Sequence, residues 1–353
     1  MLSRRHFMIL AGAAAAGARL PGSAAAAATK HSVDGVNPMA VVNPEFRGAL
    51  RKLPEQGRFG IITRANLPKL RAMVNDFATP VRRVPQVVKR VIPGFDKDPN
   101  VPIYVIGAEP GAVKPAVLHI HGGGFIAGSA RGNIGLTQRI AAGCDCVVVA
   151  PEYRLAPETP FPGPLNDNYA ALLWMYAHAR EVGVDPDRIA VMGESAGGGL
   201  AAMLAIAARN RRQVPIVLQV LIYPMLDDRT GSTHSVPGFM GQFIWTRQNN
   251  RFGWSAFLGE PAGSVSVPPG SVPARVRNLA GLPPAYIGVG SIDLFANEDI
   301  EYAKRLMDSA VPTELLVIPG GFHAFDFIAP DALLSKEFTH AWQNALRRAF
   351  VKT

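Results

Sequence analysis

Residues 189–197 read Ile-Ala-Val-Met-Gly-Glu-Ser-Ala-Gly, so an apolar run passes directly into a G-x-S-x-G pentapeptide. The helix-forming stretch 196–212 follows at once. Glycines two positions either side of a serine allow a sharp turn from a strand into a helix, and that turn leaves the hydroxyl exposed at the edge of a sheet. The pentapeptide alone is a weak signal, but its position between a strand and a helix indicates that Ser195 is a nucleophile.

Short apolar runs alternate with helical patterns from about residue 101 onward. Strands are expected at 101–106, 116–120, 146–150, 189–192, 216–222, 285–289 and 314–318. Helices are expected at 136–142, 165–181, 196–212, 297–309 and 333–351. Strands that are apolar throughout are buried on both faces, as in a parallel sheet. The sequence therefore predicts the α/β class, with a doubly wound, mostly parallel sheet flanked by helices.

Two stretches interrupt this alternation. Residues 37–91 are rich in proline and arginine, with helical pieces expected at 67–77 and 85–91. Residues 226–275 carry several aromatic side chains, which we expect to pack in the core beneath a surface helix. An insertion at the carboxyl ends of strands can also form a cap over an active site.

The first 28 residues have the pattern of a twin-arginine export signal. Ser3-Arg4-Arg5-His6-Phe7 precedes an alanine-rich apolar run that ends in small residues, and cleavage is expected within 24–28. Glycine, arginine and proline interrupt the run, which makes it a poor membrane span. The expected location is periplasmic or secreted, with no stable membrane anchor; a disordered alanine-rich extension is the alternative.

Charge and cysteine content exclude other classes. The formal net charge is +9 and falls to +6 without the three arginines of the signal. The remaining basic residues are scattered, and the densest group, at 209–212, lies where a helix ends, so nucleic-acid binding is not expected. Cys144 and Cys146 are the only cysteines and are expected to be buried thiols rather than a bridge or a metal site.

A serine nucleophile needs a base, and the base needs a group that orients it. His323 follows the strand expected at 314–318, in a glycine-containing loop, and is the favoured base, with His234 as the reserve. Asp293 follows the strand expected at 285–289 and is the favoured acid. Glu298 and Asp299 are expected to favour a helix dipole instead.

The negative charge of an acyl-transfer transition state requires nearby amide donors. The loop His121-Gly-Gly-Gly-Phe125 follows the strand expected at 116–120, and the amides of Gly122, Gly123 and Ala196 are the expected oxyanion hole. The loop lacks the pattern of a phosphate-binding glycine loop. His119 and His121 are spaced as metal ligands can be, but no third ligand is evident, and neither a metal nor another cofactor is expected.

Several motifs occur together in an ordered series: His121-Gly-Gly-Gly-Phe125, Tyr153-Arg-Leu-Ala-Pro-Glu158, Asp185-Pro-Asp-Arg-Ile189, Gly193-Glu-Ser-Ala-Gly-Gly198, Asp293-Leu-Phe and His323-Ala-Phe325. Over residues 95–350 the chain resembles the hormone-sensitive-lipase family (bacterial family IV) of carboxylesterases, an α/β-hydrolase group. The resemblance implies a helical cap, esters of short- to medium-chain acids, and the triad Ser195, Asp293 and His323. It also implies that residues 153–158 and Asp167 brace the site. Glu194 departs from the family, which usually has aspartate or threonine there.

The sequence thus predicts a serine carboxylesterase that acts on small-molecule esters through an acyl-enzyme. The expected parts are a signal (1–28), an N-terminal cap segment (29–95), a first core part (96–225), a cap insertion (226–275) and a second core part (276–353). A lactone, amide or polyester hydrolase with the same triad is an alternative, as is a non-catalytic ligand-binding protein on this scaffold. The oligomeric state stays open, with a homodimer among the options.

Overall fold

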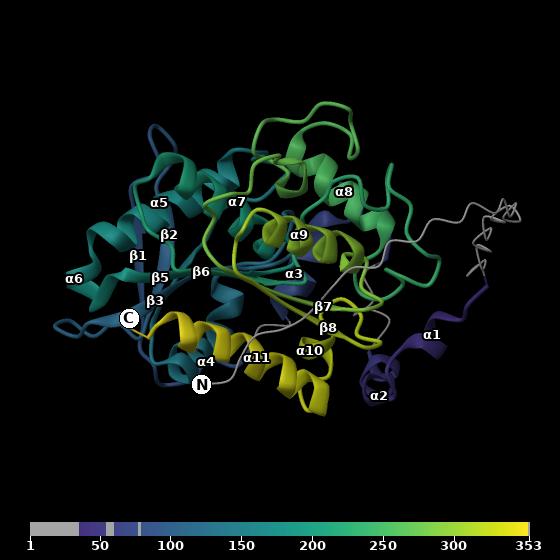
Figure 1. The fold of residues 1–353 in the computed structure, drawn as a ribbon, viewed down its shortest axis with the longest axis horizontal. Helices are drawn as coiled ribbons and strands as arrows, with labels where there is room; N and C mark the ends of the chain where they lie inside the picture. Colours follow the sequence, from purple (N-terminus) through teal and green to yellow (C-terminus); the bar gives the residue numbers. More distant parts are fainter. Residues whose placement is uncertain (1–34, 54–59, 77–78, 352–353) are drawn as a thin grey trace, which may run out of the picture. The chain divides into compact units, whose positions relative to one another are not determined.

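Strands and helices alternate along the chain, which the computed structural model describes over residues 35–53, 60–76 and 79–351 (Figure 1). The expected export signal, residues 1–28, lies outside these residues. The helices are α1 (Pro38–Val41), α2 (Pro44–Lys52), α3 (Leu67–Asp76), α4 (Ile134–Cys144), α5 (Gly163–Ala177), α6 (Ala179–Val182), α7 (Ala196–Arg211), α8 (Arg247–Leu258), α9 (Ala296–Asp308), α10 (Phe325–Ile328) and α11 (Leu333–Ala349), with the 3-10 turns η2 (Arg131–Asn133) and η3 (Pro273–Arg275). The strands are β1 (Val87–Ile92), β2 (Val101–Ile106), β3 (Lys114–Ile120), β4 (Val147–Pro151), β5 (Val184–Glu194), β6 (Leu218–Ile222), β7 (Ala285–Gly290) and β8 (Thr313–Ile318).

The strands of the described residues form one eight-stranded sheet in the order β1-β2-β4-β3-β5-β6-β7-β8. Strand β2 pairs antiparallel with both β1 and β4, and every other pair is parallel. All residues of β4, β6 and β7 are buried, as expected for strands covered on both faces. The prediction of a doubly wound, mostly parallel sheet is confirmed, and each of the seven predicted runs forms a strand.

The prediction of a helix at 85–91 is wrong, because residues 87–92 form β1. The spacing of Val87, Val88 and Val91 fits one face of a helix, but β-branched valines also favour strands, and here they pair along the whole length of β2. Four central residues of β1 are exposed, since the strand lies at the edge of the sheet. The sheet therefore begins inside the segment 29–95 that the sequence assigns to the cap.

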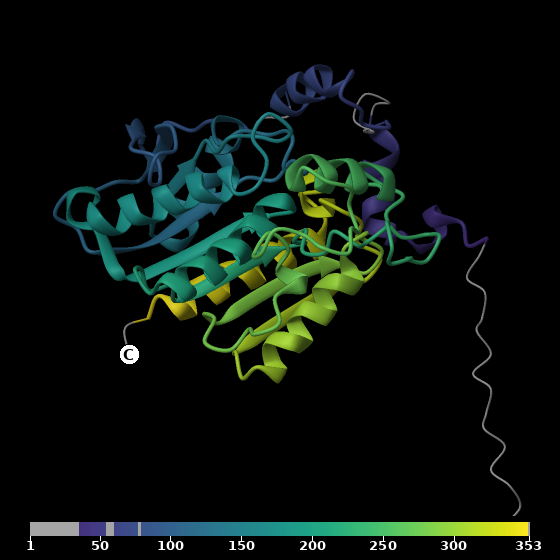
Figure 2. The ribbon, with the colours of Figure 1, turned by 90° about the horizontal axis from the view of Figure 1, so that it is seen from above.

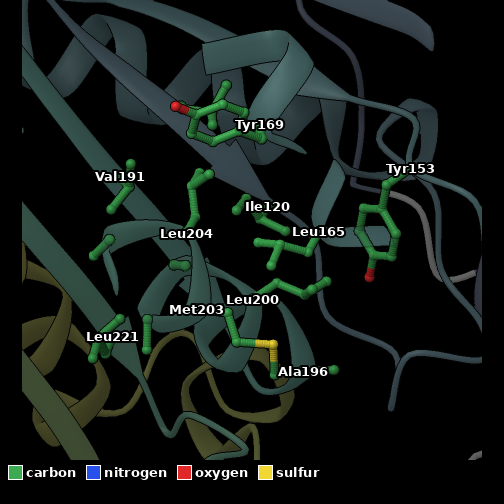
Figure 3. Packing of buried hydrophobic residues seen from close by; sticks show 14 of the residues in the cluster. Ile120, Tyr153, Leu165, Tyr169, Val191, Ala196, Leu200, Met203, Leu204 and Leu221 are labelled. Carbon is green, nitrogen blue, oxygen red and sulfur yellow. The ribbon is translucent and has the colours of Figure 1, made fainter. Parts of the chain in front are cut away.

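Helices cover both faces of the sheet (Figure 1). Helices α5 and α7 pack on one face, in the cluster that contains Leu200, Leu204 and Val191 (Figure 3). Helices α4 and α11 pack on the other face, where Phe338 and Trp342 are buried. The helix predicted at 165–181 is divided into α5 and α6 at His178, and the other helices that flank the predicted strands form as expected.

The insertion 226–275 contains α8, which packs against Phe125 and against residues 60–62 of the N-terminal segment. Trp254 and Phe257 of α8 are fully buried against Phe125, which confirms that these aromatics pack in the core. Asn249, also buried, accepts a hydrogen bond from the Ile62 amide (2.9 Å) and donates one to the Gly60 carbonyl (3.1 Å). Figure 2 shows α8 beside the N-terminal helices.

The remaining structural expectations concern the thiols and the membrane. Cys144 and Cys146 are both free and buried, as predicted, and burial raises the pKa of the Cys146 thiol well above its ordinary value. Within the part of the chain that the structure describes, no helix has both the length and the apolar character needed to cross a membrane.

Candidate active site

Ser195 stands at a strained turn between β5 and α7. Its φ of 56° and ψ of −121° place a residue with a side chain in a sparsely populated region, which is typical of a nucleophile at a strand-to-helix turn. The turn is tight because α7 begins against β3. A Cβ atom at Gly197 would stand 2.0 Å from the Ile120 carbonyl oxygen, so only glycine fits there.

The structure brings Ser195, His323 and Asp293 together. The Nε2 atom of His323 lies 2.9 Å from the Ser195 hydroxyl oxygen, and its Nδ1 atom lies 2.8 Å from a carboxylate oxygen of Asp293. The three side chains come from the ends of β5, β8 and β7, respectively, and all three residues are buried. Parallel strands present their carboxyl ends at one edge of the sheet, which explains how residues so far apart in sequence meet.

The contacts of the imidazole set its tautomer and orientation. A carboxylate can only accept, so Nδ1 carries the proton that is donated to Asp293, and Nε2 accepts the proton of the Ser195 hydroxyl. The rings of Tyr223 and Phe295 lie edge-on to the imidazole at 4.9 and 5.2 Å. The other carboxylate oxygen of Asp293 accepts the Phe295 amide. The orientation of the His323 imidazole is therefore fixed by a hydrogen bond and by two ring contacts.

The other candidate residues lie elsewhere. The side chain of His234 is 53% exposed, lies 3.6 Å from Asp227 and does not line the cavity that contains Ser195. Glu298 accepts hydrogen bonds from the amides of Leu226 and Asp227, and burial raises its pKa well above the ordinary value. Its neighbour Asp299 is also buried, and its pKa is raised for the same reason.

The glycine loop after β3 lies against the nucleophile. A Cβ atom at Gly122 would stand 2.9 Å from the Glu194 carbonyl oxygen and 3.4 Å from the Cβ of Ser195. Gly123 has a φ of +126°, and a Cβ atom there would meet the Ala127 carbonyl oxygen at 2.0 Å. Ala196 is the first residue of α7, where the amide has no acceptor within its own helix. Gly122 and Gly123 line the same cavity as Ser195, and Ala196 directly follows Ser195 in the chain.

His121 supports this loop, a role that the sequence reasoning missed. Burial lowers the pKa of His121 to about 4, so the ring is neutral, and its Nδ1–H donates to the Gly122 carbonyl oxygen at 2.8 Å. Because a trans peptide places its C=O and N–H on opposite sides, this bond turns the Gly123 amide away from His121. The Tyr153 hydroxyl donates a hydrogen bond to the His121 carbonyl oxygen (2.8 Å). The rings of the two residues are stacked, with 4.2 Å between their centroids.

His119 and His121 have separate partners. Since β3 ends at Ile120, His121 no longer follows the alternation of the strand, and His119 alone faces Glu194, at 2.9 Å. In the described ranges, no group of three or more histidine, cysteine, aspartate or glutamate side chains is arranged to hold a metal ion.

The segment 153–158 is fixed by ion pairs. Arg154 binds both carboxylate oxygens of buried Asp167, and Arg71 of α3 binds both oxygens of Glu158. Arg71 also donates to the carbonyls of Ile126 and Ala156, so it links the N-terminal segment to the oxyanion loop region. No sequence pattern could have paired Arg71 with Glu158, because 87 positions separate them.

A cavity of about 620 Å³ opens onto Ser195 and His323. Its lining includes the apolar side chains of Leu70, Val74 and Trp245. It also includes the polar side chains of Glu194, Asp326, Lys336 and His340. Burial raises the pKa of Asp326 to about 6, and the Tyr223 hydroxyl donates to this carboxyl at 3.0 Å.

Comparisons with known proteins agree with this fold. The family described as "alpha/beta hydrolase fold" matches residues 117–327. Carboxylesterase NlhH of Mycobacterium tuberculosis is 30% identical over 318 residues, which cover 88% of this chain and 98% of that relative. Esterase LipI of the same organism is 40% identical over 207 residues, covering 58% of this chain and 63% of LipI.

A solved structure has the same fold over most of the chain. The structure named "Bacterial Heroin Esterase" superposes with a TM-score of 0.79 at 36% identity and covers 90% of this chain and 100% of its own. The family match, the relatives named as esterases and the mostly parallel sheet point to the same conclusion. The chain belongs to the α/β-hydrolase family and is a carboxylesterase of its hormone-sensitive-lipase-like group.

Proposed function

We propose that the protein hydrolyses esters of short- to medium-chain carboxylic acids through an acyl-enzyme formed on Ser195. The observation that carries this proposal is the continuous contact from Asp293 through His323 to Ser195, with distances of 2.8 and 2.9 Å inside the protein. A non-catalytic binding protein would not need a serine in a strained turn beside a base, so that alternative is not favoured.

In the first half of the reaction, His323 accepts the Ser195 proton while the serine oxygen attacks the ester carbonyl. Asp293 keeps the imidazole in the required tautomer and stabilises the imidazolium that forms. The amides of Gly122, Gly123 and Ala196 stabilise the negative oxygen of the tetrahedral intermediate. His323 then gives the proton to the departing alcohol.

In the second half, His323 takes a proton from water, and the resulting hydroxide attacks the acyl-enzyme. The intermediate collapses to the carboxylic acid and Ser195 regains its proton. The apolar residues of the cavity lining, which include Leu70, Val74 and Trp245, suit a hydrocarbon group of the ester.

The direct test is hydrolysis of p-nitrophenyl acetate and butyrate by the wild-type chain and by Ser195→Ala. We expect the substitution to abolish hydrolysis while the melting temperature stays within a few degrees. Retention of most of the activity would contradict the assignment of Ser195. A panel of p-nitrophenyl esters from acetyl to long acyl chains, together with a lactone, an amide and a polyester, would separate the proposed substrate class from its alternatives.

We also propose that the protein is exported by the twin-arginine route. The support is the Arg4-Arg5 pair with the following apolar run in residues 1–28. Replacement of both arginines by lysine should leave the precursor in the cytoplasm, as measured by cell fractionation and immunoblotting. Unchanged export would contradict the proposal.

A further inference from the structure

Glu194, the residue that departs from the family pattern, forms a buried contact with His119. Both carboxylate oxygens of Glu194 lie within hydrogen-bond distance of His119 Nε2, at 2.9 and 3.1 Å. The His119 side chain is fully buried, and that of Glu194 is 16% exposed, toward the cavity that contains Ser195. A hydrogen bond to an ionised carboxylate is stronger than one between neutral groups and holds its partners in a narrower geometry.

The hydrogen-bonded pair of Glu194 and His119, called the bridge below, connects two neighbouring strands. His119 of β3 pairs with Met192 of β5, and Glu194 lies two residues farther along β5 on the same face. Neighbouring strands are about 4.8 Å apart and two residues advance about 6.6 Å, so this diagonal spans about 8 Å. An aspartate is shorter than glutamate by one carbon–carbon bond, about 1.5 Å. It would leave the carboxylate out of hydrogen-bond distance of His119.

The two ends of this bridge lie next to the two parts of the proposed catalytic machinery. Glu194 directly precedes Ser195, and His119 is three residues before Gly122. The backbones also touch there, because the Glu194 carbonyl oxygen lies directly against Gly122. The bridge therefore joins β3 and β5 at the level where the nucleophile and the oxyanion loop leave the sheet.

The bonding of His119 shows that Glu194 is its one polar partner. Its other ring nitrogen, Nδ1, is buried and has no hydrogen-bond partner among the described residues. The imidazole proton is therefore on Nε2, where it is donated to the carboxylate. No other side chain of the described residues forms a hydrogen bond that could fix this ring.

We propose that Glu194 and His119 are positioning residues that set the spacing between Ser195 and the amides of Gly122 and Gly123. The inference rests on the proposed function, since it assigns no new chemistry. A displacement of about 1 Å between reacting groups can lower a rate about 100-fold. Loss of one oxyanion donor typically lowers kcat by about 100- to 1,000-fold. If the bridge is broken and the loop of Gly122 and Gly123 shifts, stabilisation of the transition state should therefore fall more than binding of the ester.

The test compares Glu194→Asp with Glu194→Gln on p-nitrophenyl butyrate. The aspartate side chain is too short to form the hydrogen bond with His119, whereas glutamine keeps the length of glutamate and one acceptor oxygen for His119. We expect E194D to lower kcat about 10- to 100-fold with KM changed less than about threefold, and E194Q to lose clearly less, about three- to tenfold. The inhibition constant of a trifluoromethyl ketone, which forms a tetrahedral adduct with a nucleophilic serine, should rise in E194D by the factor by which kcat/KM falls.

A second pair of variants tests whether Glu194 acts through His119. His119→Phe removes the donor but keeps a buried ring, and we expect a loss of kcat similar to that of E194D. In the double variant E194D/H119F the loss should not multiply, because either change alone already breaks the bridge. The matched control is Glu314→Asp on β8, which makes the same chemical change at an exposed ion pair and should leave kcat unchanged.

Unchanged kcat in E194D, an equal loss in E194Q, or multiplied losses in the double variant would each overturn the inference. Should E194D fail to fold, the kcat, KM and inhibition constant of H119F and E194Q decide the question by the same criteria. A wild-type chain without esterase activity, or an active Ser195→Ala variant, would instead overturn the proposed function. The two failures are thus distinguishable.

Discussion

The carboxylate of Asp293 accepts a hydrogen bond of 2.8 Å from His323 at a point where Asp293 is fully buried and His323 is only 4% exposed. We predict that Asp293→Asn lowers kcat roughly 1,000- to 10,000-fold, as the equivalent change does in serine proteases, because the amide can donate to Nδ1 and favours the wrong tautomer. Steady-state kinetics checks this, with the melting temperature as the control for folding. A loss below tenfold would show that another group orients His323.

The glycine loop offers a test of the oxyanion hole. Gly123→Ala places a Cβ atom 2.0 Å from the Ala127 carbonyl oxygen at a residue with φ +126°, so the loop must shift. We predict a fall in kcat of about 100- to 1,000-fold with little change in KM. Gly48→Ala is the matched control: it lies in α2 with open space around its Cβ and should leave kcat unchanged. Equal kinetics for the two variants would contradict the prediction.

The Asp326 carboxyl predicts a pH dependence of stability. Burial raises its pKa to about 6 in the folded protein, from about 4 in an unfolded chain. The folded state thus binds the proton more tightly, and this contribution to stability is present below about pH 4 and lost as the pH rises through about 6. Asp326→Asn keeps an acceptor for Tyr223 but cannot titrate.

Relative to the wild type, the free energy of unfolding of Asp326→Asn should therefore rise by about 2 to 3 kcal/mol between pH 4 and pH 7.5. Urea denaturation of both proteins at the two pH values measures this difference. A difference that is constant with pH would exclude the carboxyl as its source.

The ion pair between Arg154 and Asp167 predicts a loss of stability. Asp167 is 1% exposed, and Arg154→Met would remove the positive charge beside its buried carboxylate and leave it the Arg154 backbone amide as a donor. We predict a loss of about 2 to 4 kcal/mol in the free energy of unfolding, measured in urea. Arg348→Met, at an exposed pair with Glu314, is the control and should cost less than about 1 kcal/mol. Similar losses in the free energy of unfolding for both variants would show that the pair of Arg154 and Asp167 contributes no more to stability than an exposed pair.

The sequence was sufficient to predict the sheet and to choose the three residues that meet at the proposed site. Each of Ser195, Asp293 and His323 follows a buried strand, and in a parallel sheet such positions lie at one edge. The chain order also agrees with the fold. These inferences need only local patterns and one rule of topology.

Other features depend on contacts that no local pattern encodes. The edge strand β1 has a sequence that suits either a helix or a strand, and only its pairing with β2 decides between them. The pair of His119 and Glu194 depends on the register of β3 against β5, across 75 positions of sequence. Nothing in the sequence indicates the role of His121, because its partner is a backbone carbonyl, which no residue pattern marks.

The hydrogen bonds of Asn249 have a consequence for how this pocket can change. They join two stretches of cap that are 187 positions apart through a side chain with no exposure, so neither stretch can be altered without disturbing the other. We therefore expect that replacing one of these stretches with that of a relative is tolerated only when the other is replaced with it. A substitution at Asn249 in the insertion acts on the N-terminal segment as well, although the two are far apart in the sequence.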